Sequence, residues 1–399
     1  MKLVVKYRIN PTPEESEVLQ KLGTYATKLY NTDNYIRREE WAKTGKIPNW
    51  YKQKKRLKNN HWYKLLPSQT AQGVIKSLQD AYNSWFKLRK TDEDAGPPMF
   101  RKNNRLSPLT FYQQFVIEGD VITFRMSKKF RKETGVDRIS FKVNKWRGIE
   151  GIPKMCNIIF QDGKWIVHVV YEVPEKPLNN NPEIMAVDVG IVNLATTVDT
   201  NGNSTIYSGK GALSVQHYFN KEIVKVQSKT KKQHNKKWSN TLSRMCEKKK
   251  RQTNQIIHTV TKEVIKEAQR NGVGTIVVGD VKNIRKGKHW NKKASQKLHS
   301  WGFAKLISQI EYKAKLSGIQ VKKVSERDTS KTCSICGMVK ASNRKHRGLY
   351  VCECGNKMNA DVNGGVNLLK KYLRENNISR SIGSVVEPSI WRCVNVIPS

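Results

Sequence analysis

The chain has 399 residues, too many for one hydrophobic core, so two or three domains are expected. Its 74 Lys and Arg residues oppose 33 Asp and Glu residues, which gives a formal net charge of +41. A charge of this size opposes compaction unless a polyanion neutralises it, and it therefore favours nucleic acid as the partner over a merely soluble basic protein.

Two other classes are disfavoured by the sequence. No apolar run approaches the roughly 20 residues that span a bilayer, and the first residues, MKLVVKYRINPTPEE, lack the apolar core of a signal peptide. The seven cysteines are odd in number and four of them lie within residues 333–354, which favours a metal site in a reducing compartment over a disulfide framework. We expect a cytoplasmic, nucleoid-associated protein.

The first half of the chain changes its hydrophobic period. Residues 2–9 alternate as a strand, and Thr12 with Pro13 marks the start of a helical region that continues to about residue 90. Residues 108–173 are typical of short strands joined by the turns EGD and QDGK. They predict a small barrel or sandwich that the N-terminal strand could complete, followed by a linker rich in Pro and Asn.

Strands and helices alternate in the second half. MAVDVG, NLATTVDTNG and STIYSG predict three consecutive strands, followed by a long basic helical stretch at about 214–271. TIVVGD, a helix at 295–318 and IQVKKVSE come next, then a Cys-rich insert and the helix NADVNGGVNLLKKYLRE. This order indicates an RNase H-like fold.

Two acids stand in positions that suggest metal binding. Asp188 lies in an apolar strand, where a carboxylate is costly unless it is paired or binds a metal, although backbone amides at a turn could also hold it. Asn359 can cap the last helix, which places Asp361 in the first turn, where the helix dipole alone favours an acid. In this element order the two acids together predict a two-metal site for phosphodiester cleavage, with two Mg²⁺ ions and Mn²⁺ as the alternative metal.

Four cysteines predict a second metal centre, and they are Cys333, Cys336, Cys352 and Cys354. Two close pairs, C-x₂-C and C-x-C, are typical of a closed structural zinc site. Because the second pair is tighter than usual, His346 remains an alternative ligand. Asp328 precedes Thr329 and is expected to cap the turn that leads into the site.

The motifs MAVDVGIVNLAT, TSKTCSICG and NADVNGGVNLL together resemble the TnpB family, the transposon-encoded ancestors of type V CRISPR nucleases. The similarity extends to about residue 372. It implies an RNA-guided DNA endonuclease that takes its guide RNA from the transposon end and reads a short adjacent DNA motif itself. One RuvC site would cut both strands of double-stranded DNA, and one protein monomer would bind one RNA.

The resemblance also implies the fold class and its domains. The fold expected is multidomain α/β, in which a β-barrel wedge domain with an inserted helical recognition domain precedes an RNase H-like (RuvC) nuclease domain with a zinc-binding insert. The expected boundaries are wedge barrel 1–10 and 105–175, helical recognition domain 11–104, RuvC-like domain 184–328 and 359–376, zinc-binding target-nucleic-acid module 329–358, and disordered tail 377–399.

One position departs from the family pattern. The second acid commonly closes the fourth strand, as in IVIED, but TIVVGD has Gly279 there. Asp280 is one residue further and points to the opposite face of a strand. Glu326 ends the neighbouring fifth strand and is long enough to reach the same metal. We take Asp188, Glu326 and Asp361 as the catalytic Mg²⁺ ligands, with Asp280 as the alternative and loss of activity as a third possibility.

Nucleic-acid contacts are expected on two helical regions. The basic stretch within 214–271 would meet phosphates without reading sequence. Gln72 and Lys76 share one helix face and by resemblance help to read the adjacent motif. The alternatives to a guided nuclease are a guided DNA-binding repressor without cleavage, a miniature type V CRISPR effector and a cut-and-paste transposase. Nothing in the sequence specifies transposon-end joining, so the transposase fits poorly.

Overall fold

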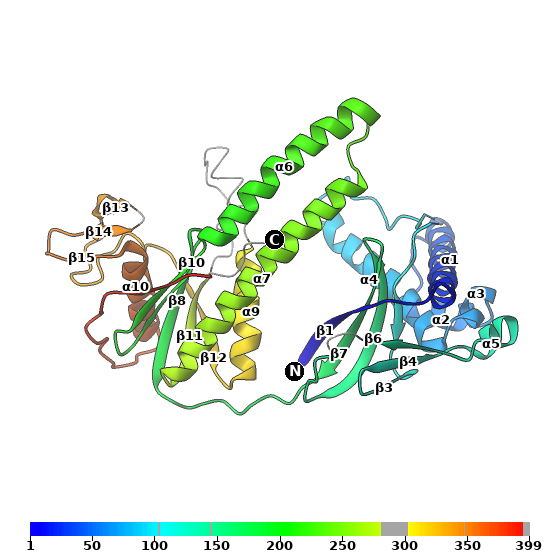
Figure 1. Ribbon diagram of the computed structural model, residues 1–399, viewed down its shortest axis with the longest axis horizontal. Helices are drawn as coiled ribbons and strands as arrows, with labels where there is room; N and C mark the ends of the chain where they lie inside the picture. Colours follow the sequence, from blue (N-terminus) through cyan, green and yellow to red (C-terminus); the bar gives the residue numbers. More distant parts are fainter. Residues whose placement is uncertain (103, 144–145, 281–301, 347, 394–399) are drawn as a thin grey trace. The chain divides into compact units, whose positions relative to one another are not determined.

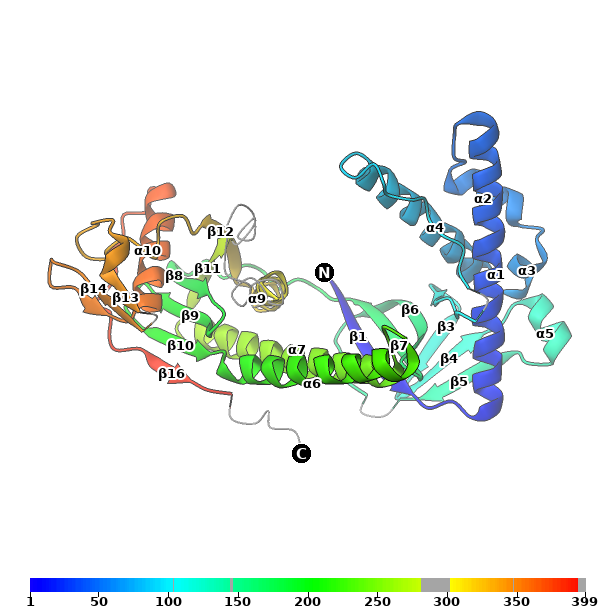
Figure 2. The same cartoon turned by 90° about the horizontal axis from the view of Figure 1, so that it is seen from above.

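The computed structural model describes residues 1–102, 104–143, 146–280, 302–346 and 348–393. The chain divides into two compact units, Met1–Pro174 and Glu175–Ser399. Figures 1 and 2 show their elements in two views. The first part of the helix expected at 295–318 lies outside the described residues. The described part of the chain contains no helix with the length and apolar character that a bilayer crossing requires.

The described residues of the first unit form helices and two small sheets. Its helices are α1 (Pro13–Thr44), α2 (Trp50–Leu57), α3 (His61–Leu65), α4 (Ser68–Arg89) and α5 (Lys128–Thr134). Its strands are β1 (Lys2–Ile9), β2 (Leu109–Phe111), β3 (Phe115–Glu118), β4 (Val121–Arg125), β5 (Arg138–Lys142), β6 (Ile152–Gln161) and β7 (Lys164–Glu172).

The N-terminal strand joins the later strands, as the sequence suggests. β1 pairs antiparallel with β7 along its whole length, in a sheet of order β1-β7-β6-β2. Strands β3, β4 and β5 form a second sheet, and the rings of Phe111 and Phe124, 4.7 Å apart, join the two sheets. A single closed barrel stays a prediction.

Helix α1 begins where the sequence predicts. The Thr12 side chain accepts a hydrogen bond from the Glu15 amide, and the Glu15 carboxylate accepts one from the Thr12 amide, which together form a capping box. Pro13 occupies the first helical position. The helix ends at Gly45, whose φ of +65° is a left-handed conformation that glycine adopts without strain.

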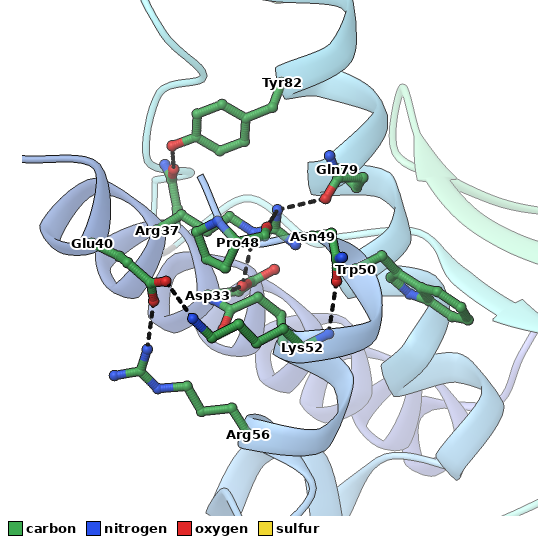
Figure 3. A network of polar contacts seen from close by, with 12 residues as sticks. Asp33, Arg37, Glu40, Pro48, Asn49, Trp50, Lys52, Arg56, Gln79 and Tyr82 are labelled. Atoms are coloured by element: carbon green, nitrogen blue, oxygen red, sulfur yellow. Dashed lines mark hydrogen bonds and ion pairs between the residues drawn. The ribbon is translucent and has the colours of Figure 1, made fainter. Parts of the chain in front are cut away.

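A buried ion pair connects the helices of this unit (Figure 3). Asp33 and Arg37 of α1 are both fully buried, and Arg37 Nε donates to Asp33 Oδ1 at 3.0 Å. Arg37 Nη1 also donates to the Pro48 carbonyl and to Gln79 of α4, while Gln53 of α2 donates to Asp33. Burial raises the pKa of Asp33, and the Arg37 charge opposes that rise. The network therefore fixes three helices around one compensated charge.

We expect Arg37→Ala to destabilise this unit by about 3–5 kcal/mol, because it leaves the Asp33 carboxylate buried without its counter-ion. Arg56→Ala is the matched control, since Arg56 pairs with Glu40 at the exposed edge of the same region (Figure 3). Equilibrium denaturation of the full chain, followed by tryptophan fluorescence, measures both changes. Equal small losses for the two variants would contradict the expectation.

In its described residues, the second unit contains one large sheet, four α-helices, a short 3₁₀ helix and a small Cys-rich module. Its helices are α6 (Lys210–His234), α7 (Asn240–Arg270), α9 (Phe303–Leu316), η1 (Ala341–Asn343) and α10 (Ala360–Glu375). Its strands are β8 (Glu183–Val189), β9 (Asn193–Asp199), β10 (Ser204–Ser208), β11 (Val273–Asp280), β12 (Gln320–Ser325), β13 (Arg344–His346), β14 (Leu349–Val351), β15 (Lys357–Met358) and β16 (Ser389–Trp391).

The large sheet has the order β12-β11-β8-β9-β10-β16. Strands β8, β9 and β10 are antiparallel neighbours, whereas β11 runs parallel to β8 and β12 runs parallel to β11. Three antiparallel strands followed by two parallel ones match the order expected for an RNase H-like fold. Helices α6, α7 and α9 pack on one face of the sheet, and α10 packs on the other (Figure 2).

The basic stretch expected at 214–271 is two helices and not one. Helix α6 ends at Asn235, whose φ is +47°, and α7 begins after its cap Ser239. The two helices then run side by side (Figures 1 and 2). The periodicity is helical throughout, and an Asn in a left-handed conformation is what ends the first helix.

The tail expected to be disordered is ordered over its described part. Strand β16 adds to the edge of the large sheet, parallel to β10. The Gly383 amide donates to the Thr200 carbonyl at 3.0 Å, and the rings of Trp391 and Tyr207 lie 5.6 Å apart. Backbone pairing at a sheet edge needs no apolar period, which is why the sequence pattern did not predict this strand.

Candidate active site

Asp188 lies near the end of the central strand β8, on the face covered by α10. Ile184 and Ala186 of β8 belong to the core that packs against α10, and alternation along the strand places Asp188 on the same face. Gly364 of α10 faces it, since a Cβ at that glycine would lie 3.1 Å from Oδ2 of Asp188. The missing side chain allows α10 to approach the carboxylate closely.

Glu326 occupies the space that a side chain at Gly279 would fill. Gly279 of β11 pairs with Val324 of β12, two residues before Glu326. A Cβ at Gly279 would lie 1.9 Å from Oε1 of Glu326 and 2.4 Å from its Cδ, so no other residue fits there while Glu326 keeps this position. The glycine in the fourth strand and the glutamate after the fifth are therefore complementary in shape.

Asp280, the alternative acid, belongs to the opposite face of the sheet. Val278 of β11 packs in the core under α7 and α9, whereas Val277 packs in the core under α10. Alternation then places Gly279 on the face of Asp188 and Asp280 on the other.

Asp361 is the third acid and stands in the first turn of α10. Asn359 caps the helix, and its side chain accepts hydrogen bonds from the amides of Asp361 and Val362. The Asp361 carboxylate accepts a hydrogen bond from Asn193 Nδ2 at 2.7 Å and one from Arg344 Nη2 at 2.7 Å. Its side chain is 18% exposed, so it is open at one side.

The charges of the three acids act on one another. Burial raises the pKa of Asp188 well above its ordinary value, and the negative charges of Glu326 and Asp361 raise it further. The positive charge of Arg344 and the Val189 amide oppose this rise. A bound cation would relieve the electrostatic repulsion between these partly buried carboxylates.

The residues present fit a magnesium site. The donors are carboxylate oxygens, which suit Mg²⁺, and the space beside Gly279 admits the carboxylate of Glu326. Within the described residues, the acids do not form a group whose ligand atoms all lie within 4.8 Å of one another. The Asp361 carboxylate accepts hydrogen bonds from Arg344 and Asn193 instead.

Arg344 and Asn193 are site residues that sequence reasoning missed. Arg344 comes from the Cys-rich module, 17 residues before Asp361, and Asn193 begins β9. A hint for Asn193 existed, because it follows Asp188 within MAVDVGIVNLAT and a turn returns the chain beside β8. No local pattern marks Arg344, because the fold of the module determines where it points.

The four predicted cysteines meet in the module formed by β13, β14 and β15. The Sγ atoms of Cys333, Cys336, Cys352 and Cys354 all lie within 4.8 Å of one another. The Cys333–Cys354 and Cys336–Cys352 sulfur separations are 3.6 and 3.7 Å. Tetrahedral zinc with Zn–S bonds of about 2.3 Å requires sulfur separations of about 3.8 Å. The geometry therefore fits a zinc ion.

Local contacts prepare the cluster for a metal. Burial raises the pKa of Cys333, but hydrogen bonds from the amides of Cys336 and Ile335 and from the Asn356 side chain outweigh it, so that the pKa falls to about 6. Each cysteine pair is followed by a glycine with positive φ, which lets the backbone turn around the sulfurs.

Two of the predicted contacts near the cluster differ in the structure. His346 is exposed, its Nδ1 accepts from the Gly348 amide, and it is not part of the sulfur cluster. Asp328 does mark the turn, but with its backbone, because its carbonyl accepts from Lys331 and Thr332 and its φ is +65°.

Gln72 and Lys76 lie on α4 in the first unit. The Gln72 carbonyl accepts a hydrogen bond from Trp50 Nε1, and the exposed Lys76 pairs with Asp80 at 3.1 Å. Both contacts are made within the first unit. The expected role of Gln72 and Lys76 in binding nucleic acid stays a prediction.

The fold and these two groups of side chains define a class: a multidomain α/β protein with an RNase H-like sheet and a four-cysteine cluster. The family described as "Probable transposase" matches residues 168–285, and the family described as "Cas12f1-like, TNB domain" matches residues 303–368. A TnpB-like protein of Methanocaldococcus jannaschii is 32% identical over 218 residues, which cover 52% of this chain and 73% of that protein. The chain belongs to the TnpB-like family.

Other relatives match over most of their length. A TnpB-like protein of the Acidianus two-tailed virus is 26% identical over 95% of this chain and 89% of its own. A protein of Escherichia coli named a putative RNA-guided DNA endonuclease is 23% identical over 91% of this chain and 90% of its own. Among solved structures, a Cas12f1–sgRNA–target DNA complex matches with a TM-score of 0.64 and 18% identity, over 90% of this chain and 83% of that one. This last likeness shows a shared fold.

We expect Asp188→Asn to stabilise the metal-free protein at neutral pH. Because the pKa of Asp188 is raised in the fold, the folded state binds the proton more tightly, and stability falls as pH rises from the ordinary Asp range through the raised value. The variant removes this loss, and each kcal/mol gained would raise Tm by roughly 2–4 °C in a unit of this size. Thermal unfolding in a chelator at pH 4 and pH 7 measures it. A gain as large at pH 4 as at pH 7 would contradict the assigned cause.

We expect one zinc ion per chain, lost in Cys333→Ser and in Cys352→Ser, because each substitution removes a thiolate from a closed tetrahedral set. Cys246→Ser is the control, since Cys246 of α7 lies outside the cluster. Elemental analysis of the purified protein gives the stoichiometry. Full zinc content in both cluster variants would show that the ion is held elsewhere.

Proposed function

We propose that this protein is a Mg²⁺-dependent, RNA-guided DNA endonuclease with one RuvC-type site. The relatives support the general activity, since one is named a putative RNA-guided DNA endonuclease and another a CRISPR-associated endodeoxyribonuclease, Cas12f1. Guide RNA from the transposon end and double-stranded target DNA are the proposed partners. The proposed Mg²⁺ ligands are Asp188, Glu326 and Asp361.

The observation that carries this proposal is the fit between Gly279 and Glu326. A strand acid missing at Gly279 would suggest an inactive nuclease if no carboxylate replaced it. The Glu326 side chain instead fills that space, and its charge acts on Asp188. This fit supports a set of three acids in which Glu326 takes the place of the acid missing at Gly279, and it favours cleavage over guided binding alone.

The protein's own residues arrange the acids for this chemistry. Two Mg²⁺ ions, when bound, would activate water and stabilise the attacking and leaving oxygens of an in-line displacement at phosphorus. Asn193 orients the Asp361 carboxylate by a hydrogen bond. Arg344 offsets part of the negative charge of the three acids before a cation binds. The approach of α10 at Gly364 brings the last acid to the central strand.

The basic surface of the chain supports nucleic-acid partners. Helix α6 carries six Lys against one acid, and α7 carries eight Lys and Arg against three acids. This excess would meet RNA or heteroduplex phosphates. We assign the wedge, recognition, RuvC-like and zinc-binding domains the bounds expected from the sequence, without the disordered tail, because the described part of 377–399 is ordered. In this assignment the zinc module at 329–358 lies beside the target strand, and Gln72 and Lys76 contact the adjacent motif.

The test is guided cleavage by protein co-purified with RNA from its native locus. With Mg²⁺ and a target that matches the sequenced guide, Glu326→Ala should lower the cleavage rate by more than the roughly 10–100-fold that loss of an outer-shell partner costs. Asp280→Ala should leave the rate within a few-fold of the unmutated protein, because Asp280 belongs to the other face of the sheet. Gel analysis of both DNA strands gives the rates.

A paired exchange controls for side effects of these changes. We expect Gly279→Glu alone to lose activity, because the new side chain would collide with Glu326. Combining it with Glu326→Gly removes that collision and places the acid in the strand, so the double variant should recover part of the activity. Loss of cutting in Asp280→Ala with full activity in Glu326→Ala would overturn the assignment of Glu326. Tight guided binding without cleavage by the unmutated protein would replace the nuclease by a guided repressor.

A further inference from the structure

One short segment connects the two metal centres. Residues 329–334 begin just after Glu326 and contain Cys333, the first predicted zinc ligand. The segment lies along α10, whose first turn carries Asp361. Figures 1 and 2 both show the Cys-rich module beside this helix. The position of the segment on α10 therefore affects where the acid site lies relative to the cysteine cluster.

Three side chains of α10 hold the backbone of this segment. Asn363, which is fully buried, accepts from the Ser334 amide at 3.0 Å and donates to the Thr332 carbonyl at 2.8 Å. Asn367, also buried, donates to the carbonyls of Thr329 at 2.9 Å and Thr332 at 2.6 Å. Lys370 donates to the Ser334 carbonyl.

The held segment continues to both centres by further hydrogen bonds. Toward the acids, the amide and the hydroxyl of Thr329 donate to the Glu326 carbonyl at 3.3 and 2.9 Å. Toward the cysteines, Asn356 Nδ2 donates to Cys333 Sγ and to Ser334 Oγ, both at 3.3 Å. Each centre thus has a direct connection to the backbone that α10 holds.

These contacts fix the register of the segment as well as its proximity. Asn363, Asn367 and Lys370 are spaced i, i+4 and i+7, which places them on one face of the helix. Apolar packing alone would tolerate a small slip, whereas a buried amide that loses its backbone partner costs free energy. Glu326 is therefore placed relative to Asp361 by polar contacts that the module must fold to complete.

We propose that Asn363 and Asn367 are positioning residues that couple the two centres, so that zinc on the cysteines raises the affinity of the acid site for a divalent cation. The proposal rests on the metal-binding role given to the acids under the proposed function. Linkage makes the effect reciprocal, so a cation at the acids also strengthens zinc binding. The contacts act through the backbone of Glu326 and do not touch the cation.

The experiment measures Mn²⁺ binding to the full-length protein, by calorimetry and by the loss of the free-ion paramagnetic resonance signal. Zinc-loaded Asn363→Ala and Asn367→Ala should each bind Mn²⁺ about 10-fold more weakly, the lower end of the range for outer-shell changes. Zinc-depleted unmutated protein should show a loss of similar size. Asn240→Ala, an exposed asparagine at the start of α7, should bind as the unmutated protein does. Asp361→Asn reports how much of the binding belongs to the acid site.

Zinc content and thermal unfolding show which variants are folded. If Asn363→Ala fails to fold, Asn367→Ala decides, since it removes two donors and leaves the Asn363 contacts in place. Unchanged Mn²⁺ affinity in a folded, zinc-loaded Asn367→Ala, or in the zinc-depleted protein, would overturn the coupling. Because Mn²⁺ binding is measured without RNA or DNA, a protein that binds targets and never cuts would fail the proposed function and still show the coupling.

Discussion

The structure of the second unit depends on bringing three carboxylates, those of Asp188, Glu326 and Asp361, to one face of a sheet. Asp188 lies in the central strand, where burial raises its pKa and the charges of the two other acids raise it further. Arg344 supplies a positive charge that pairs with Asp361 and opposes the rise of the Asp188 pKa. The surrounding fold must therefore hold the acids against their repulsion, and the tight approach of α10 at Gly364 and Gly365 is how it does so.

Much of this arrangement is readable from the sequence because it rests on local patterns. Asp188 interrupts an apolar strand, Asn359 with Asp361 forms a helix start, and the cysteine spacing requires a closed metal site. The face argument against Asp280 also needs only the two-residue period of a strand, and the two cores of the sheet agree with it. These features depend on a few neighbouring residues, so the chain's order is sufficient to predict them.

The features that sequence reasoning missed are contacts between distant residues. Arg344 reaches Asp361 only because a 3₁₀ turn and a short strand aim it there, and Asn193 reaches the same carboxylate from 168 residues away. The strand at 389–391 joins a sheet edge through backbone pairing, which carries no side-chain signature. In each case the partner is chosen by tertiary structure, and single-sequence periodicity contains no information about it.

A third acid at the end of β12, as proposed, is held differently from one in strand β11. A glutamate at position 279 would lie between Val278 and Asp280, which both pair with β12. The sheet would therefore hold its backbone independently of the zinc module. Glu326 instead starts the connection to that module, and its carbonyl is bound by Thr329, whose own carbonyl is bound by Asn367 of α10. If Glu326 is the third acid, as proposed, its position depends on the Cys-rich insert as well as on the sheet. On the proposed coupling, the insert would thereby take part in assembling the acid site as well as in holding zinc.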